Sequence, residues 1–260
     1  LYLDKIVEQH RATAQRDTRT TKDLIALAAK VAQPRRFIDR IRTDSVNSLA
    51  VITEIKRRSP SRGALNQNLD PTQIAQQYEQ GGASCLSVLT DQDFFGGSTE
   101  DLQQAHSSVA LPVLRKDFTV SSNDVCDARI MGADCVLLIV AALSVQELTE
   151  FKKLADELSL DTLVEVHDEP ELEIALNIGA SMIGVNQRDL KTFEVDHQRA
   201  VRMAAQMPAN VVRVAESGVR TRADAQSLRD AGYHAILVGE SLVTSTDPSE
   251  AVRLLRAAGR

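Results

Sequence analysis

Residues 132–140 read GADCVLLIV, a glycine that leads within three residues into an unbroken apolar run. The run does not alternate between polar and apolar residues, which is typical of a strand buried on both faces of a sheet. The glycine follows a segment with helical spacing (residues 123–131), and glycine accepts the left-handed conformation that turns a chain back at the end of a helix. The stretch therefore predicts a helix, a turn and a buried strand.

The same pattern recurs along most of the chain. Eight apolar runs begin 20 to 34 residues apart, at residues 51–55, 85–89, 113–114, 135–140, 162–166, 182–185, 211–215 and 235–238. Segments with helical spacing lie between them, at residues 71–80, 123–131, 145–158, 170–178 and 222–231, and four of these lead into a glycine: Gly82, Gly132, Gly179 and Gly232. Eight strand–helix units in about 215 residues match an α/β protein of the (β/α)8 TIM barrel class in number and length. An open doubly wound sheet is the alternative, although it normally has fewer strands.

The chain is predicted to form one domain, residues 1–260, because no linker or change in composition divides it. Residues 46–260 form the expected barrel. Residues 1–45 form an N-terminal helical extension, with helical patterns at residues 3–16 and 21–32. Such an extension either closes one end of the barrel or forms a lid over the active site, and the sequence leaves both open.

The composition argues against several classes of protein. The formal net charge is −6, whereas a nucleic-acid-binding domain is usually strongly basic. No apolar run approaches the ~20 residues of a membrane span, and the first residues are polar and charged, unlike a signal peptide. We therefore expect a cytoplasmic protein with no nucleic-acid or membrane partner. The three cysteines, Cys85, Cys126 and Cys135, form no CxxC pair and are expected to be small buried hydrophobic residues without a metal.

Ionisable and polar residues gather where the predicted strands end, and active sites of parallel barrels lie at the C-terminal ends of the strands. These ends carry Glu54, Lys56, Lys116, Glu165, Asn186, Arg188 and Glu216. The two-residue alternation of a strand places Glu54 and Lys56 on one face and turns Glu165 away from its valine neighbours. One buried carboxylate could belong to a structural ion pair, but three carboxylates and two lysines at the same end indicate an active site.

Two glycine-containing turns follow the last two predicted strands, at Ser217-Gly218 and Gly239-Glu240. In barrels of this class, backbone N–H groups at these positions bind a phosphate. The sequence contains no Walker loop, no dinucleotide-binding GxGxxG and no HExxH. It therefore predicts a small phosphorylated substrate.

Six motifs in a fixed order point to a known family: EIKRRSPS (residues 54–61), LRKDF (114–118), LIVA (138–141), VEVH (164–167), GVNQRDL (184–190) and AESGV (215–219). Together they resemble indole-3-glycerol phosphate synthase, and the match includes all eight strands and the N-terminal extension. The resemblance implies ring closure and decarboxylation of 1-(2-carboxyphenylamino)-1-deoxyribulose 5-phosphate in tryptophan biosynthesis, a carbon–carbon lyase reaction, with no cofactor or metal. We expect a monomer or at most a weak dimer.

The resemblance also implies roles for individual catalytic residues. Lys116 resembles the general acid that protonates the substrate carbonyl. Glu165 resembles the acid/base carboxylate, and Lys56 its partner in dehydration and substrate binding. Glu54 and Glu216 match carboxylates that hold lysines and substrate hydroxyls.

The remaining matches concern substrate binding. Asn186, counted among the catalytic residues, and Arg188 match positions near the anthranilate carboxylate. The matched phosphate positions are Ser59, Ser217, Gly218, Gly239 and Glu240, and the matched apolar wall around the aromatic ring consists of Pro60, Phe95 and Phe118. Residue 240 is a glutamate where many relatives have serine, so we expect only its backbone N–H to contact the phosphate.

The two inward-facing glutamates are expected to differ. Glu54 stands two residues from Lys56 on the same strand and is expected to be ion-paired, so that it orients the lysine. Glu165 has no basic neighbour in its own strand and is expected to act as a free base.

The residues alone are also compatible with other functions. A different sugar-phosphate barrel enzyme, such as a ribulose-phosphate epimerase, a phosphoribosylanthranilate isomerase or a Schiff-base aldolase, would also use strand-end residues. A barrel that binds a sugar phosphate without catalysis is the non-enzymatic alternative, although the retention of five ionisable residues at the strand ends disfavours it.

Overall fold

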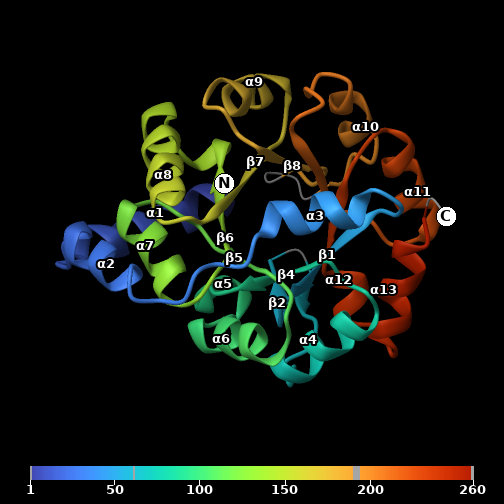
Figure 1. Cartoon of the computed structure of the whole chain (residues 1–260), viewed down its shortest axis with the longest axis horizontal. Helices are drawn as coiled ribbons and strands as arrows, with labels where there is room; N and C mark the ends of the chain where they lie inside the picture. Colours follow the sequence, from blue (N-terminus) through green and yellow to red (C-terminus); the bar gives the residue numbers. More distant parts are fainter. Residues whose placement is uncertain (1, 61, 190–193, 259–260) are drawn as a thin grey trace.

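The computed structural model describes residues 2–60, 62–189 and 194–258, and it places eight parallel strands in a closed barrel (Figure 1). The strand order is β1-β10-β9-β8-β7-β6-β5-β4, with β4 pairing back to β1. The barrel strands are β1 Ala50–Ile55, β4 Cys85–Leu89, β5 Val113–Lys116, β6 Cys135–Ile139, β7 Asp161–Val166, β8 Met182–Asn186, β9 Val212–Glu216 and β10 Ala235–Val238. Each predicted run overlaps one of these strands, so the predicted (β/α)8 barrel is confirmed. Ser61 and Leu190, which end two of the sequence motifs, lie outside the described residues.

An outer ring of helices surrounds the strands (Figure 1). After β1 a short hairpin, β2 Arg58–Ser59 and β3 Gly63–Ala64, precedes the first of them. The helices after β1 are α4 Pro71–Gln80, α5 Gln92–Phe95, α6 Thr99–Ser108, α7 Ser122–Ile130, the 3-10 turn η1 Val140–Ala142, α8 Val145–Glu157, α9 Glu169–Asn177, α10 Arg199–Ala204, α11 Arg222–Asp230, α12 Glu240–Val243 and α13 Pro248–Arg256.

Local sequence signals set the ends of many of these helices. The side chains of Asp70, Ser121 and Asp168 accept hydrogen bonds from first-turn backbone N–H groups of α4, α7 and α9, which caps their N-termini. The four glycines that follow predicted helices all have positive φ, between 73° at Gly179 and 96° at Gly132. The turn back into the sheet thus uses the conformation that the sequence predicts.

The barrel interior is filled by apolar side chains. Its buried cluster includes Ala50, Ile52, Cys85, Leu114, Cys135, Leu137, Leu163, Met182, Val214, Ala235 and Leu237. Two residues further along their strands, the same inner face carries Glu54, Glu165 and Glu216. The N-terminal part of the barrel is therefore a packed core, and its C-terminal end is a ring of polar and ionisable groups. The three cysteines are free and buried, as predicted.

The N-terminal extension contains three helices where the sequence predicts two: α1 Tyr2–Arg16, α2 Thr21–Ala28 and α3 Phe37–Ser45. The predicted second helix ends four residues too late. The prediction missed α3, which has no side-chain cap and is held by tertiary packing: Phe37 and Ile41 are fully buried in the barrel-interior cluster. The backbone N–H of Ile38 donates to Asp161 Oδ2, at the first residue of β7, 2.9 Å away. Thus α3 closes the N-terminal end of the barrel.

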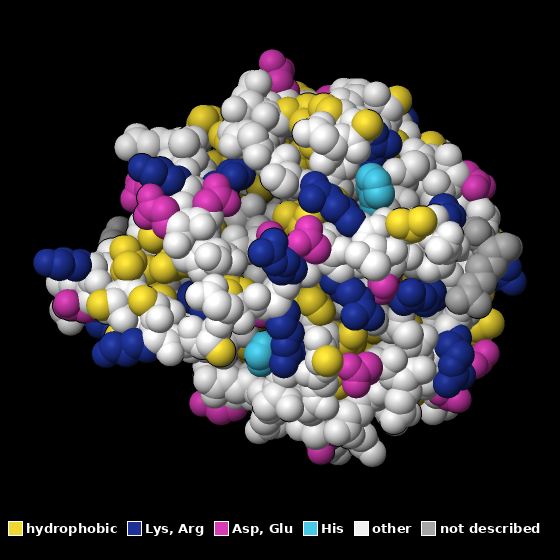
Figure 2. Space-filling model, viewed as in Figure 1, with side chains coloured by type: hydrophobic (Ala, Val, Ile, Leu, Met, Phe, Trp, Pro, Cys, Tyr) yellow, Lys and Arg dark blue, Asp and Glu magenta, His cyan; other side chains and the backbone are white. Residues whose placement is uncertain are grey.

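The outer side of α3 faces the viewer in Figures 1 and 2 and carries both basic and acidic side chains. Arg40 Nε lies 3.1 Å from Asp44 Oδ2, and Arg36 lies 3.4 Å from Asp39. None of the helices in the described parts of the chain has the length and apolar character needed to cross a membrane.

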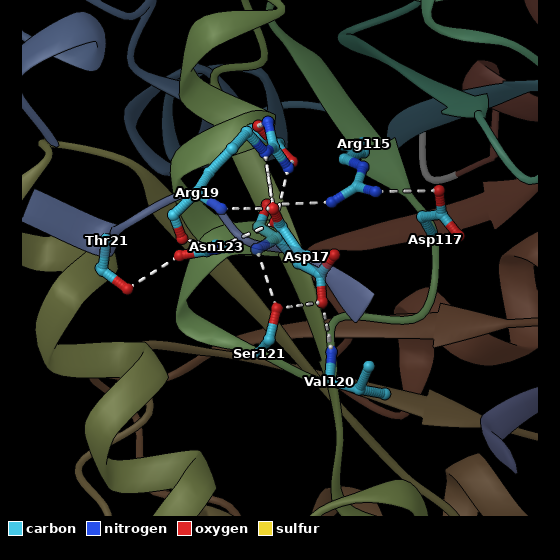
Figure 3. A network of polar contacts seen from close by, with 10 residues as sticks. Asp17, Arg19, Thr21, Arg115, Asp117, Val120, Ser121 and Asn123 are labelled. Carbon is cyan, nitrogen blue, oxygen red and sulfur yellow. Dashed lines mark hydrogen bonds and ion pairs between the residues drawn. The ribbon is translucent and has the colours of Figure 1, made fainter. Parts of the chain in front are cut away.

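The segment between α1 and α2 docks on α7 through side-chain hydrogen bonds (Figure 3). Arg19 pairs with Asp17 and with Asp127 of α7, each at 2.8 Å. The amide of Asn123 donates to Asp17 Oδ2, and its oxygen accepts from the hydroxyl of Thr21. These contacts attach the chain that follows α1 to helix α7 of the barrel.

Candidate active site

A cavity of about 390 Å³ opens at the C-terminal end of the barrel. Every residue that the sequence assigns to the site lines it: Glu54, Lys56, Ser59, Pro60, Phe95, Lys116, Phe118, Glu165, Asn186, Arg188, Glu216, Ser217, Gly218, Gly239 and Glu240. These residues come from strands and loops distributed around the whole barrel, so the strand order brings together groups that are far apart in the sequence.

One side of the cavity holds a cationic side chain between two carboxylates. Lys116 Nζ, at the end of β5, lies 3.7 Å from Glu165 Oε2 on β7 and 3.9 Å from Glu216 Oε2 on β9. The amide of Asn186, at the end of β8, donates to Glu165 Oε1 at 3.2 Å. Burial would lower the pKa of Lys116, but Glu165, Glu216 and Glu54 raise it above its usual value. Lys116 is therefore fully protonated at neutral pH.

The two carboxylates beside Lys116 have pKa values that are displaced in opposite directions. Burial raises the pKa of Glu165, but the positive charge of Lys116 and contacts from His167 and Asn186 lower it below the usual value. Burial and the charge of Glu165 raise the pKa of Glu216 well above the usual value. A pair of carboxyl groups separated in this way supplies a base and a neutral acid within one site.

The absence of a side chain at Gly184 of β8 leaves room for the Glu216 carboxylate. A Cβ on Gly184 would collide with Glu216 Oε1. Gly239 stands in the same relation to Glu54, because a Cβ there would collide with Glu54 Oε1. Both inward carboxylates thus pack directly against backbone.

On the β1 side, Lys56 forms an ion pair with Glu54 Oε1, as predicted. Burial raises the pKa of Glu54, but Lys56 and Lys116 lower it below its usual value. The resemblance pairs Lys56 with Glu165, whereas in the structure the lysine that contacts Glu165 is Lys116. The reason is local: Lys56 lies two residues after Glu54 on the same face, within direct reach of its carboxylate.

Glu165 has no basic neighbour within β7, as predicted, but in the folded protein it is not free of basic partners. His167 Nε2 lies 3.4 Å from Glu165 Oε1, and Lys116 Nζ lies 3.7 Å from the other carboxylate oxygen, Oε2. His167 lies at the bend that follows β7, two positions after Glu165, and its ring contacts the same carboxylate. The strand alone, ending at Val166, does not include that neighbour.

The turns after β9 and β10 border the cavity, and the turn after β10 lies next to the hairpin β2–β3. Ser217 and Gly218 both have positive φ, 66° and 77°. The Ser217 hydroxyl donates to Asn186 Oδ1 at 2.9 Å, which ties this turn to β8. The Glu240 carboxylate is ion-paired with Arg62, whose Nε lies 3.0 Å from Oε1. The acidic side chain at position 240 thus has a cationic partner beside the predicted phosphate positions.

Aromatic and apolar side chains form the remaining wall. The rings of Phe95 and Phe118 lie 6.4 Å apart between centroids. Helix α1 completes this wall with Tyr2, Leu3 and Ile6. Within the N-terminal extension, α3 therefore closes the N-terminal end of the barrel and α1 forms part of the cavity wall at the other end.

Helix α1 is held at the mouth of the barrel by His10, whose Nε2 lies 2.9 Å from Asp91 Oδ2 and 3.8 Å from Asp117 Oδ1. Asp91 also caps α5 by accepting from the backbone N–H groups of Phe94 and Phe95. Asp117 is ion-paired with Arg115 at 3.1 Å. This histidine and the two carboxylates could approach one cation, but their present partners give them a structural function as the anchor of α1.

Comparison with known proteins agrees with this site. The family model described as indole-3-glycerol phosphate synthase matches residues 3–255. The chain belongs to the indole-3-glycerol phosphate synthase family. An indole-3-glycerol phosphate synthase of Mycolicibacterium vanbaalenii is 48% identical over 258 residues, covering 99% of this chain and 94% of that protein. One from Chloroherpeton thalassium is 44% identical over 247 residues, covering 94% and 95%.

Solved structures of low sequence identity share the barrel. A thiamine phosphate pyrophosphorylase from Pyrococcus furiosus has a TM-score of 0.59 at 18% identity, covering 82% of this chain and 96% of that one. A geranylgeranylglyceryl phosphate synthase from Thermoplasma acidophilum has a TM-score of 0.58 at 15% identity, covering 85% and 97%. The indole-3-glycerol phosphate synthase match begins in α1 and ends in α13, so the N-terminal extension is part of the family's unit.

Sequence reasoning missed several residues at or beside the site. Those of the cavity wall include Tyr2, Leu3, Ile6, Arg62, Asp91 and Asp117. His167 and Glu171, behind Glu165, were also missed. The spacing of two between Glu165 and His167 was the available signal for the histidine. No comparable signal places α1 against the barrel, because that contact depends on the path of the chain between distant elements.

Proposed function

We propose that the ionisable residues at the barrel mouth carry out the reaction of the indole-3-glycerol phosphate synthase family. The enzyme is a carbon–carbon lyase of tryptophan biosynthesis: it closes the ring of 1-(2-carboxyphenylamino)-1-deoxyribulose 5-phosphate and releases CO₂ and water. The observation that carries the assignment of residues is the position of Lys116 between Glu165 and Glu216, whose pKa values are displaced in opposite directions.

In the first step, the aromatic carbon that bears the carboxylate attacks the ribulose carbonyl carbon. The carbonyl oxygen gains negative charge, and Lys116 Nζ donates a proton to it. A protonated lysine in a buried site both neutralises this charge and supplies the proton. The ionised Glu165 keeps Lys116 charged, and the contacts with Glu165 and Glu216 hold its ammonium group in the cavity.

Loss of CO₂ then breaks the bond to the carboxylate and returns its electron pair to the ring. The new hydroxyl leaves as water after taking a proton from Lys56, and Glu165 removes a proton from the neighbouring carbon to form the indole double bond. The two lysines give two protons and Glu165 takes one, so one proton enters from solvent in each turnover. Glu54 holds Lys56 in place throughout.

The rest of the cavity binds the substrate. The turns at Ser217-Gly218 and Gly239-Glu240 hold the phosphate by backbone N–H groups. The rings of Phe95 and Phe118 contact the anthranilate ring of the substrate, and Arg188 binds the anthranilate carboxylate. These assignments are supported by the fact that all of these residues line the same cavity.

The test is to mix purified protein with the carboxyphenylamino ribulose phosphate and follow indole fluorescence. We expect product to form, and Lys116→Ala to reduce turnover by ~10²-fold or more, the usual scale of general acid–base catalysis. Absence of product from the wild-type protein would contradict the function. Near-normal turnover by Lys116→Ala would contradict the role of this lysine alone. A cytoplasmic location and a monomeric or weakly dimeric state also remain predictions, the latter testable by light scattering.

A further inference from the structure

An imidazole links the buried Glu165 to a second carboxylate at the rim of the barrel. His167 Nε2 lies 3.4 Å from Glu165 Oε1, and His167 Nδ1 lies 3.1 Å from Glu171 Oε2. Glu171 Oε2 also accepts the backbone N–H of His167 at 2.7 Å. The backbone N–H of Glu171 in turn donates to Asp168, the cap of α9, which fixes the backbone that carries this carboxylate at the start of the helix.

The geometry sets the protonation state of the ring. A neutral imidazole has one N–H and one unprotonated nitrogen, which would face a carboxylate and be repelled by it. A carboxylate lies at hydrogen-bond distance from Nδ1 and another at ion-pair distance from the buried Nε2, so the imidazolium is the form that both carboxylates favour. Burial would lower the pKa of His167, but Glu165 and Glu171 raise it to about 10.

We infer that His167, as an imidazolium, is a positioning residue for Glu165, holding the carboxylate ionised and oriented toward the substrate. This inference rests on the proposed function, since it explains how the base of that reaction is kept ready. His167 is not among the residues that line the cavity, so it acts through Glu165 and touches no substrate. The inference also explains the position of Glu171, whose carboxylate holds the His167 ring from the side remote from the cavity.

The charged groups around this link come from several elements. Glu171 on α9 and Glu165 on β7 face the ring directly. On the cavity side, Glu165 is faced by Lys116 of β5, and Glu216 of β9 and Glu54 of β1 lie near it. The 3-10 turn η1, which packs against α9 and β7, contributes only valine and alanine. Lys116 and His167 therefore stabilise the ionised form of Glu165 from opposite sides.

The first experiment does not depend on activity. In the wild-type protein labelled with ¹⁵N, the imidazole signals of the five histidines are followed by NMR from pH 5 to 10, with His167→Gln identifying the signal of interest. We expect both nitrogens of His167 to stay protonated at pH 8, and Glu171→Gln to lower the midpoint of its titration. A His167 that becomes neutral near pH 6.5 would overturn the inference, whatever the enzyme's activity.

The second experiment separates positioning from structure by kinetics. We expect His167→Gln to lower kcat about 10-fold with KM within about twofold, and to move the acidic limb of the kcat/KM profile up by about one pH unit, the scale on which a nearby opposite charge shifts a carboxyl group. Glu171→Gln should move the limb in the same direction by less. It serves as the second variant if His167→Gln does not fold.

Glu173→Gln is the matched control, because it removes the same charge from an exposed position of the same helix. It should keep the wild-type profile. An unmoved acidic limb in folded His167→Gln or Glu171→Gln would overturn the positioning role while leaving the proposed function intact. No turnover by the wild-type protein would instead count against the proposed function.

Discussion

The two sides of the barrel mouth hold their carboxylates in different ways. On the β1 side, Glu54 is paired with Lys56, two residues further along the same chain segment. On the β7 side, Glu165 is surrounded by groups from four elements, including Lys116 of β5 and Asn186 of β8. The β1 pair is local and requires only an extended backbone. The β7 cluster exists only when the barrel closes in the correct register.

This difference matters for chemistry. A carboxylate bound to one lysine serves to hold that lysine, because its charge is already matched by a single partner. Glu165 lies among several charged and polar groups, and together they lower its pKa. The pKa of the neighbouring Glu216 is raised instead. General acid–base catalysis needs such tuned groups, so we expect the β7 side to perform proton transfer and the β1 side to orient.

The largest expected effect comes from removing charge on either side without changing shape. Glu165→Gln should lower kcat by ~10²-fold or more with KM roughly unchanged, because its contribution is made mainly in the transition state. Glu54→Gln should change kcat and KM together, since it loosens a lysine that contacts substrate in both states. Steady-state kinetics of the two purified variants measures this. Identical kinetic signatures would show that the two sides do not differ in function.

A smaller effect is expected from moving the carboxylates without altering them. Gly184→Ala adds a methyl group against Glu216, and Gly239→Ala adds one against Glu54. Since a shift of about 1 Å at a reacting group can cost ~10²-fold, we expect Gly184→Ala to lower kcat by about 10- to 100-fold. Gly239→Ala should mainly raise KM, because it disturbs the orienting side and the phosphate turn. A normal kcat in folded Gly184→Ala would show that the placement of Glu216 is not critical.

The smallest effect concerns stability. The folded-state pKa of Glu216 is raised, so its stabilising contribution is present below the unfolded value of ~4.3 and is lost as pH rises toward the folded value. Glu216→Gln needs no proton and should raise Tm at pH 8 by roughly 2–4 °C, with a smaller difference at pH 5. The folded-state pKa of Glu165 is lowered, so Glu165→Gln should lower Tm at pH 8 and recover as pH falls.

Thermal unfolding of the wild type and both variants at the two pH values tests these signs. A drop in Tm for Glu216→Gln at pH 8 would mean that this carboxyl group is ionised and well paired in the folded protein. The two sides of Lys116 would then not differ in protonation.

Much of the barrel is predictable because its signals are local. The unbroken apolar runs predict strands buried on both faces, and the glycines after the helices mark the turns, as at Gly132. The sequence analysis did not predict the short helices α5, α10 and α12, nor the longer helices α6 and α13. Alternation from Ile52 to Glu54 and from Leu163 to Glu165 predicts correctly which side chains point inward.

By itself, the sequence determined the strands, their inward faces, the Glu54–Lys56 pair and the membership of every predicted residue in one cavity. The strands, their inward faces and the pair follow from spacing along one strand, and the ionisable residues share a cavity because parallel strands finish at the same end. Other site residues, such as Pro60 and Phe95, were predicted from the resemblance to the family. Only the tertiary structure decided that Lys116 lies between Glu165 and Glu216, that His167 joins Glu165 to Glu171, and that α3 and α1 cover opposite ends of the barrel. The contacts of Lys116, α1 and α3 depend on barrel register and on the packing of segments far apart in the chain. The contacts of His167 depend on how the chain turns between β7 and α9, which spacing along the strand does not determine.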